Sequence, residues 1–417
     1  MKNQKLIPFI LSAALIATAG ATYLTGTSET TSAASESTSE NASEAVSITL
    51  NGSTAQADSD AVTVDGSNIT ITSEGTYILS GTLDNGSIIV DADKEAKVQL
   101  VLNCASIHSD TFAALYVLQA DKVFVTLESG TENSLSNGGS FVLIDENEVD
   151  AVIYAKDDIT FNGTGSLTIT SPGGHGIVGK DEVTFTDGEY QISASDNAIR
   201  AKDSIAVAGG TYVLDAEDGL HAENSDDETL GNIYITGGTF TINASDDGIH
   251  ATALLQIDGG TFDITAAEGL EATYIKINDG EFSISASDDG INAAYKSSAY
   301  TPTLEINGGT LTIVMGAGDT DAVDSNCDLI VNGGTLDITA SSAFDYDGTA
   351  QYNGGTIIIN GQTVNSIPNS MMGGGMGGNK GNMGGMGDMS GMGDMGNMGG
   401  NGGMGGNGGR HPGRGGW

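Results

Sequence analysis

Short runs of alternating apolar and polar residues fill the chain from Val46 to about residue 366. Examples start at Val62 (VTV), Tyr77 (YIL) and Val123 (VFVTL), and Gly, Asn, Asp or Ser separates the runs. A two-residue period rich in β-branched and aromatic residues predicts short β-strands joined by turns. No helical period extends over ten residues after the N-terminal segment, so we expect an all-β fold.

The runs also repeat. The residue after a paired-glycine position recurs with successive spacings of 22, 28, 22, 20, 29, 25 and 21 residues. Two or three short strands in such a period are typical of one coil of a parallel β-helix. We predict a right-handed, single-stranded parallel β-helix over residues 46–366, with an irregular N-terminal cap up to about Asp93. The eight copies begin at Glu189, Thr211, Thr239, Thr261, Glu281, Thr310, Thr335 and Thr356.

Within a copy, Gly-Gly precedes a strand such as Thr-Phe-Thr-Ile, and a turn such as Ser-Asp-Asp-Gly-Ile follows. Alternation along a strand predicts that Phe and Ile face inward while Thr faces solvent. The segments between Ala222 and Asn232 and from Tyr295 to Pro302 lengthen two copies, and we expect both to form loops on one face. The predicted inward residues include Phe240, Ile242, Ile249, Phe262, Ile264, Leu270, Phe282 and Ile284.

Stacked coils place the acidic turn residues above one another at about 4.8 Å. Carboxylates so spaced repel by about 1 kcal/mol or more per pair, and Ca²⁺ with six to eight oxygen ligands relieves this repulsion. We predict two or more Ca²⁺ ions along this edge, although Asp-Gly is also a good turn former by itself. The predicted calcium ligands are Asp218, Asp246, Asp247, Glu268, Glu271, Asp288, Asp289, Asp321 and Asp324.

A second column follows the turns, and its polar residues are candidates to bind a ligand. His221 and His250 fall on consecutive coils with Glu271 on the next. This arrangement fits either a transition-metal site or simple outward polar side chains beside the acids. Tyrosines near the acidic edge can stack on a pyranose ring. The candidate ligand-binding residues are Arg200, His221, His250, Tyr274, Asn292 and Tyr295.

The charge balance restricts the partners. There are 55 acidic and 14 basic residues, for a net charge of −41, which argues against nucleic acid and anionic membranes because both need basic clusters. Cys104 and Cys327 are 223 residues apart in a fold with mainly local contacts. We expect two free thiols, interpreted as small buried core residues.

Both ends differ from the repeats. Lys2 and Lys5 precede an apolar run and small-residue cleavage sites, which predicts a signal peptide over residues 1–21, with an uncleaved anchor as the alternative. Residues 22–45 are a predicted disordered spacer, and residues 367–417 a predicted disordered tail rich in Gly, Met and Asn. We expect a secreted or cell-surface monomer with no membrane span after signal removal.

Four linked runs resemble a known family: GTYILSGTL (75–83), VQLVLN (98–103), AALYV (113–117) and GTGSLTI (163–169). With the Gly-Gly-Thr and Ser-Asp-Asp-Gly-Ile turns, they resemble the clostridial carbohydrate-binding β-helix family over residues 46–366. The resemblance implies a pectate-lyase-like parallel β-helix with bound calcium that binds cellulose or acidic sugars without established catalysis. The chain departs from this pattern at Ser341-Ser342, where the last full coil lacks turn acids.

The residues and the resemblance together predict calcium-dependent, non-catalytic binding of an acidic or cellulosic polysaccharide. Two alternatives stay open. A pectate-type lyase needs a base beside a metal-bound uronate, and Arg200 with Lys202 is the main basic cluster of the repeats. A structural or adhesion protein of the cell surface needs no sugar ligand.

Overall fold

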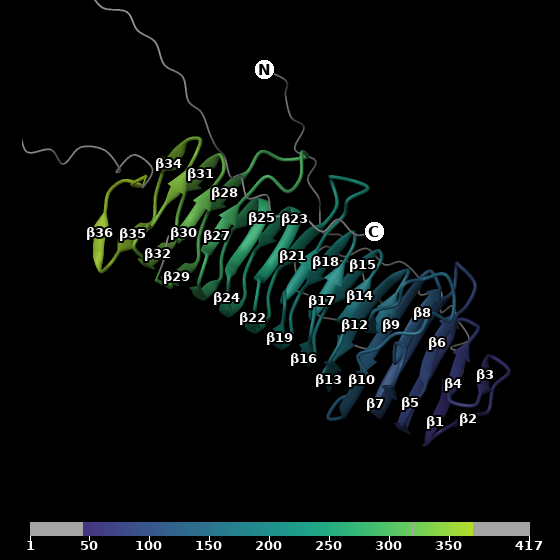
Figure 1. The fold of residues 1–417 in the computed structure, drawn as a ribbon. Coiled ribbons are helices and arrows are strands. Elements are labelled where there is room, and N and C mark those ends of the chain that lie inside the picture. Colours follow the sequence, from purple (N-terminus) through teal and green to yellow (C-terminus); the bar gives the residue numbers. More distant parts are fainter. Residues whose placement is uncertain (1–44, 318–319, 370–417) are drawn as a thin grey trace, which may run out of the picture.

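The computed structural model describes residues 45–317 and 320–369. Its 36 strands form a solenoid of about 12 turns, and the described residues contain no helix. Figure 1 shows the strands stacked from β1 at one end to β36 at the other, with neighbouring coils paired in parallel. The prediction of an all-β parallel β-helix is therefore confirmed.

One side of the solenoid, here called the Thr-Phe face, carries the repeat seen in the sequence. All eight predicted copies begin at the first residue of a strand. The aromatic rings stack inside the solenoid, with centroids 4.9 Å apart for Phe240 and Phe262 and 4.6 Å apart for Phe262 and Phe282. The strands of this face are β10 (Glu132–Asn137), β13 (Ser166–Ser171), β16 (Glu189–Ala194), β19 (Thr211–Ala216), β22 (Thr239–Ala244), β24 (Thr261–Ala266), β26 (Glu281–Ala286), β29 (Thr310–Met315), β32 (Thr335–Thr339) and β35 (Thr356–Ile359).

The Asp-Gly face follows the acidic turns. All the predicted inward residues are at most 2% exposed, which confirms the alternation on this face and on the Thr-Phe face. The strands β23 (Asp247–Ile257) and β25 (Glu268–Ile277) start here and bend into the third face. The others are β6 (Ser87–Asp91), β8 (Leu115–Gln119), β11 (Ala151–Ala155), β14 (His175–Gly179), β17 (Ile199–Ala201), β20 (Leu220–Ala222), β27 (Asp289–Ala293), β30 (Asp321–Ser325) and β33 (Asp345–Tyr346).

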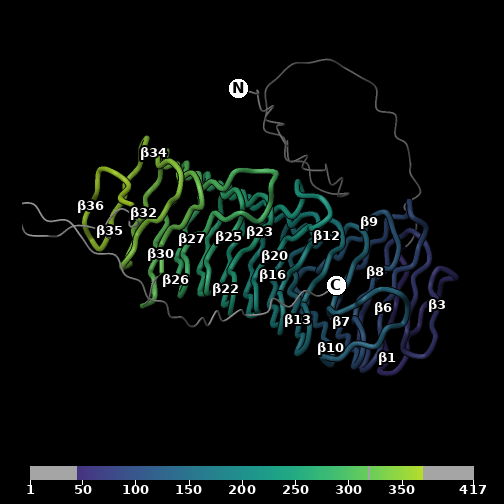
Figure 2. The backbone as a smooth tube through the Cα atoms, turned by 45° about the horizontal axis from the view of Figure 1, so that its top comes forward, coloured from purple at the N-terminus to yellow at the C-terminus, as the bar shows by residue number. Residues whose placement is uncertain are grey.

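The third face closes each coil. Its strands return the chain to the paired glycines, where Gly260 has a φ of 119°, a region that favours glycine. Figure 2 shows the backbone winding through successive coils of similar shape. The remaining strands of this face are β9 (Lys122–Leu127), β12 (Asp158–Gly163), β15 (Glu182–Phe185), β18 (Ser204–Val207), β21 (Asn232–Ile235), β28 (Thr303–Ile306), β31 (Asp328–Val331) and β34 (Ala350–Tyr352).

The N-terminal cap is shorter than predicted. Strands β4 (Asn68–Ile71), β5 (Gly75–Leu83) and β7 (Lys97–Ser109) already pair in parallel with their neighbours. Two antiparallel pairs lie before them, formed by β1 (Val46–Gly52) with β2 (Ala55–Ala57) and by β3 (Val62–Asp65) with β4. The expectation of an irregular segment up to Asp93 is wrong because these coils lack the paired glycines that reveal the repeat. At the other end, β36 (Gln362–Val364) pairs antiparallel with β35 and covers its open edge.

The two cysteines are free, as predicted. Their interpretation as buried core residues is wrong, because Cys104 is exposed and Cys327 is partly exposed. Cys104 has a φ of 56° and lies beside a register shift between β5 and β7. This irregularity takes its side chain out of the inward positions.

The glycine of the Asp-Asp-Gly turn has a packing role. A Cβ atom on Gly248 would lie 2.5 Å from the carbonyl oxygen of Gly269 and 2.5 Å from Cγ2 of Ile264. Close approach of the next coil therefore requires glycine here, which turn preference alone does not explain. Neither reason accounts for the acids that surround this glycine.

Candidate functional site

Two parallel columns of polar side chains run along the C-terminal half of the Asp-Gly face. In the turn column, Asp247 pairs with Glu268 and Asp289 pairs with Asp321. The outer column lies three residues later on each coil. Its successive members are Arg200, His221, His250, Glu271, Asn292, Asp324 and Asp345.

The two insertions border these columns. The first lies between β20 and β21 and the second between β27 and β28, so both leave the solenoid at the same corner. The hydroxyl of Ser297 donates to the carbonyl oxygen of Glu228 at 2.6 Å, joining the loops. Both project from the upper side in Figure 1, which confirms the prediction of one shared face.

One part of the columns compensates its own charge, and we call it the imidazole cluster. Nδ1 of His250 lies 2.7 Å from Oδ2 of Asp247 and 2.7 Å from Oε2 of Glu271. Nζ of Lys296 lies 2.8 Å from the other carboxylate oxygen of Glu271. One coil earlier, Nδ1 of His221 lies 2.8 Å from Oδ2 of Asp218. The cluster comprises Asp218, His221, Asp247, His250, Glu271 and Lys296.

The pKa values follow from these contacts. Burial lowers the pKa of His250, but hydrogen bonds to Asp247 and Glu271 outweigh burial and raise it to about 9. Burial raises the pKa of Glu271, but His250 and Lys296 outweigh it and lower the pKa to about 2. At neutral pH the cluster therefore holds the imidazolium of His250 against the carboxylate of Glu271.

Acids without such compensation begin on the coil of Glu271 and continue over the coils of β27, β30 and β33, and we call them the acid row. It comprises Glu268, Asp289, Asp321, Asp324 and Asp345, all partly buried. Within residues 45–317 and 320–369, none of these five carboxylates forms a salt bridge with a basic side chain. Asp321 accepts a hydrogen bond from the hydroxyl of Ser342, and Glu268 accepts one from Nδ2 of Asn292 at 3.0 Å.

Three members of the acid row have strongly raised pKa values. Burial and the charge of Glu271 raise the pKa of Glu268 to about 8. Burial and neighbouring acids raise the pKa of Asp289 to about 7 and that of Asp324 to about 6. Each of these carboxylates is unstable as an anion in the fold unless a cation lies close to it.

Two buried oxygen atoms near the acid row have no hydrogen-bond donor among the described residues. Asn292 is 9% exposed and stands between Glu271 and Asp324 in the outer column. Its Nδ2 atom donates toward the preceding coil, while its Oδ1 atom is buried and has no hydrogen-bond partner in the described part of the chain. The same holds for Oδ1 of Asp345. The donor set fits an oxygen-ligated hard cation such as Ca²⁺.

Other predicted site residues lie apart from the row. Asp246 and Asp288 are exposed at the turns. Arg200 donates to Glu223 at 3.1 Å. Tyr274 lies on the third face, where its hydroxyl donates to Glu305. Tyr295 is 68% exposed on the second insertion.

Sequence reasoning missed the insertion residues that reach the columns. Lys296 contacts Glu271, and Glu223 contacts both Arg200 and His221. The repeat spacing reveals that insertions exist, but it gives no sign of where their side chains point.

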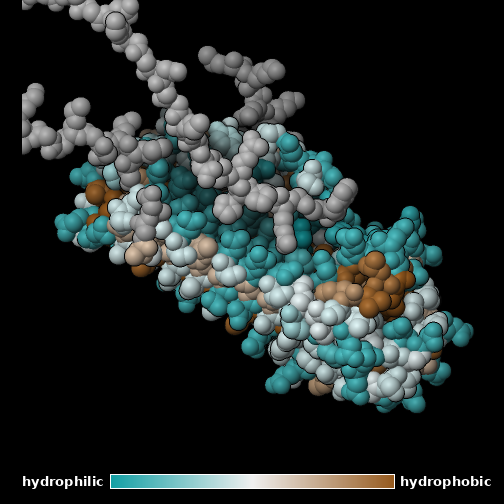
Figure 3. Space-filling view, viewed as in Figure 1, coloured by the Kyte–Doolittle hydropathy of each residue, from teal (hydrophilic) through white to brown (hydrophobic). Residues whose placement is uncertain are grey.

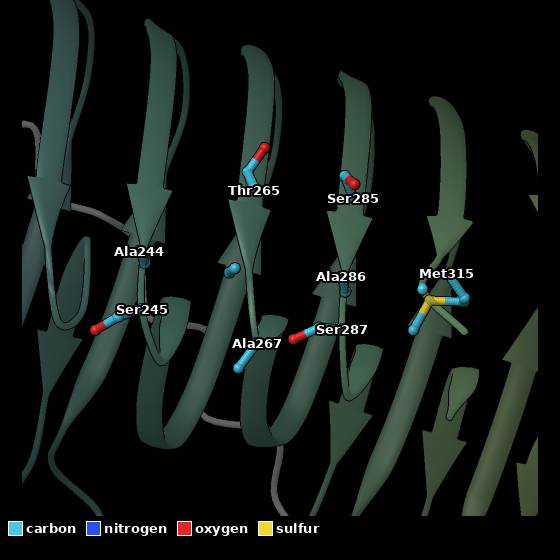
Figure 4. Close-up of a pocket in the computed structure, with 10 residues that line it drawn as sticks. Ala244, Ser245, Thr265, Ala267, Ser285, Ala286, Ser287 and Met315 are labelled. Carbon is cyan, nitrogen blue, oxygen red and sulfur yellow. The ribbon is translucent and has the colours of Figure 1, made fainter. Parts of the chain in front are cut away.

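A shallow groove of about 390 Å³ lies beside the acidic turns, at the ends of the Thr-Phe strands (Figure 4). Ser245 and Ser287 line it, and each directly precedes an exposed turn acid, Asp246 or Asp288. The groove is thus a hydroxyl-bearing recess next to the acids. Its lining comprises Ala244, Ser245, Thr265, Ala266, Ala267, Ser285, Ala286, Ser287, Met315 and Gly316.

The N-terminal half of the Asp-Gly face has a different surface. Its outer column holds Tyr116, Tyr154 and Val178, which pack in a separate buried apolar cluster. The segment between β10 and β11 exposes Val142, Leu143 and Ile144. Figure 3 shows a hydrophobic patch over the N-terminal coils, whereas most of the visible remainder is hydrophilic.

A family model and two known proteins are similar to this chain. A family model described as "Carbohydrate-binding domain-containing protein" matches residues 65–274 and 268–369. A protein of the same description from Acetivibrio thermocellus is 34% identical over 137 residues, which cover 32% of this chain and 48% of that protein. The chain thus spans about half the length of this relative. A solved polysaccharide lyase-like protein from C. thermocellum, a gadolinium derivative, is 22% identical with a TM-score of 0.44, covering 76% of this chain and 98% of its own.

Proposed function

The chain belongs to this carbohydrate-binding domain family, and on that premise we propose that it binds polysaccharide beside its acid row with Ca²⁺ as the bridging ion. The observation that carries the proposal is the set of partly buried carboxylates that have no basic partner among residues 45–317 and 320–369, next to the Oδ1 atom of Asn292, which has no hydrogen-bond partner there. Calcium would supply positive charge there and leave coordination positions for sugar oxygens. Of the calcium ligands predicted from the sequence, we retain Glu268, Asp289, Asp321 and Asp324.

The proposed glycan carries carboxylates. A chain with a net charge of −41 repels an anionic polymer. The nearby cations Arg200, Lys202 and Lys296 are already in ion pairs with acids of the chain. A uronate polymer therefore needs the bridging metal, whereas neutral cellulose does not.

Affinity electrophoresis in gels containing polygalacturonate or soluble cellulose derivatives tests this function. We expect Ca²⁺ to retard the full-length protein in polygalacturonate and EDTA to abolish the retardation. Asp289→Asn should weaken it, while Asp288→Asn, a change of the exposed neighbouring acid, should not. Retardation that persists in excess EDTA would contradict the bridging role. Binding to neither glycan would favour a structural surface protein.

The lyase alternative has its own readout. Release of unsaturated uronate, lost on Arg200→Ala, would establish it in place of simple binding. In the structure Arg200 donates to Glu223, so a role as a base requires that this pair opens. We propose binding without catalysis.

We propose that the protein acts outside the cell. The predicted signal segment and both predicted disordered segments lie wholly or almost wholly outside the described residues. No helix in the described part of the chain is long and apolar enough to cross a membrane. Immunoblotting of culture medium and cell fractions, with and without residues 1–21, tests secretion.

A further inference from the structure

Three donor atoms from two successive coils converge inside the imidazole cluster. Oδ2 of Asp247, Nδ1 of His250 and a carboxylate oxygen of Glu271 all lie within 4.8 Å of one another. We infer that these three residues form a binding site for a transition-metal dication such as Zn²⁺, separate from the calcium proposed for the acid row.

The contacts of His250 motivate this site. Its Nδ1 atom is 2.7 Å from an oxygen of Asp247 and 2.7 Å from an oxygen of Glu271. One ring nitrogen carries at most one proton, and both facing atoms are acceptors. The single N–H must therefore be shared between two carboxylates. A dication in place of that proton binds the nitrogen lone pair and both oxygens at once.

The donor types select the metal. Imidazole nitrogen with carboxylate oxygens suits zinc and related metals, whereas Ca²⁺ takes oxygen ligands. The acid row offers only oxygen, so the two stretches differ in the metal that they select. Three protein ligands leave a fourth zinc position for water or another oxygen ligand.

Neighbouring groups hold the three donors in place. Nζ of Lys296 binds Oε1 of Glu271 and leaves Oε2 free for a metal. Oδ1 of Asp218 accepts the backbone N–H of Asp247 at 2.9 Å. The ring of His221 stacks on His250 with centroids 4.5 Å apart. Such partners orient the ligands of metal sites.

Burial of the donors adds support. The side chains of His250, Asp247 and Glu271 are only 12%, 9% and 4% exposed, so they are ordered by packing. The neighbouring ring of His221 is also held, because its Nε2 atom lies 3.5 Å from Oε2 of Glu223. Charged side chains that served only as a solvated surface would instead expose their donor atoms to water.

The binding step is balanced by proton release. Nδ1 of His250 faces carboxylate oxygens of Asp247 and Glu271, each at 2.7 Å, so it carries a proton in the metal-free protein. Zn²⁺ binding breaks the Nδ1–H bond, forms an Nδ1–Zn bond and releases that proton to the buffer. When the carboxylates of Glu271 and Asp247 are ionised, they exchange the Nδ1–H group of His250 for the metal and release no proton.

Titration of the metal-free, full-length protein with Zn²⁺, and with Co²⁺ as a spectroscopic substitute, tests the site. We expect saturable binding in the presence of excess Ca²⁺, visible d–d absorption with Co²⁺, and proton release detected by calorimetry in two buffers of different ionisation enthalpy. His250→Ala should weaken binding by more than about 100-fold, beyond the usual effect of a supporting partner. His108→Ala is the matched control, because His108 pairs with Asp110 on another face.

The outcomes separate this site from the proposed function, because no glycan is present. Absence of Zn²⁺ and Co²⁺ binding would overturn the inference, as would a His250→Ala variant that binds like the wild type. Equal competition by Ca²⁺ would also overturn it, since a nitrogen-containing site discriminates against calcium. Circular dichroism and melting of His250→Ala establish that the variant is folded, and His250→Gln provides a second variant of similar size.

Discussion

The imidazole cluster and the acid row adjoin on one face, and they share the strand β25, which holds both Glu271 and Glu268. In the cluster, His250 and Lys296 neutralise Glu271, and the pKa of that acid falls to about 2. In the row, Glu268 has no basic partner among the described residues, and its pKa rises to about 8. The difference shows that the basic side chains in contact with an acid decide whether it stabilises the fold or requires a ligand. For Glu271 these are His250 on the preceding coil and Lys296 on an insertion.

The largest expected effect comes from breaking the cluster. Glu271→Ala leaves the buried imidazolium of His250 and the ammonium of Lys296 without their shared carboxylate. Removal of one partner of a buried ion pair typically costs about 3–5 kcal/mol. Asp324→Asn removes charge from the acid row and should leave the metal-free protein equally or more stable. Thermal melting of both variants in EDTA makes the comparison, and equal losses would show that the two stretches do not differ.

Calcium should act on the acid row alone. At 100 times its dissociation constant, a ligand of the folded state adds about 2.7 kcal/mol to stability. We therefore expect Ca²⁺ to raise the melting temperature of the wild type, and expect Asp289→Asn to reduce that rise. Asp288→Asn, next to it but exposed, should retain the full effect. An equal response of the two variants in calorimetry would place calcium elsewhere.

The two stretches should respond oppositely to acid. Glu268, Asp289 and Asp324 of the acid row have folded pKa values of about 6 to 8, above their ordinary values. Their contribution is greatest below about pH 4 and is lost as the pH rises through 6 to 8. The pKa of Glu271 is lowered, so its contribution is present above about pH 4.5 and is lost as the pH falls toward 2.

Melting temperatures measured from pH 3 to pH 9 in EDTA check these signs. Asp289→Asn combined with Asp324→Asn should flatten the loss between pH 5 and 8, because the variant lacks two groups that take up protons there. Added Ca²⁺ should also reduce the loss of melting temperature of the wild type between pH 5 and 8. A wild-type melting temperature that rises steadily from pH 5 to 8 in EDTA would contradict the raised pKa values.

The smallest effect is expected at Tyr295, which is 68% exposed on the insertion beside the cluster. Tyr295→Ala should change stability by less than about 0.5 kcal/mol. If the ring stacks on the glycan, affinity should fall by no more than about tenfold, since one aromatic contact contributes about 0.5–1.5 kcal/mol. Tyr295→Phe should retain that affinity. A loss in the Phe variant as large as that in the Ala variant would assign the effect to the hydroxyl group.

The repeat and its alternation predicted most of the solenoid. The paired glycines, Phe240 and Ile249 follow local rules of turn geometry and burial, and these rules act within one coil. The sequence did not predict the N-terminal coils, because their turns lack the paired glycines. It did not predict the exposure of Cys104, because a register shift depends on the neighbouring strand.

The sequence by itself determined the coil, the inward side chains and the existence of stacked acids, because a period of 20–29 residues forces equivalent positions into register. Only the tertiary structure decided which acids are compensated. Lys296 and Glu223 reach the columns from insertions, and loop conformation is not encoded by the repeat. The same face therefore holds a charge-balanced imidazole cluster and, directly beside it, acids that have no basic partner in the described residues.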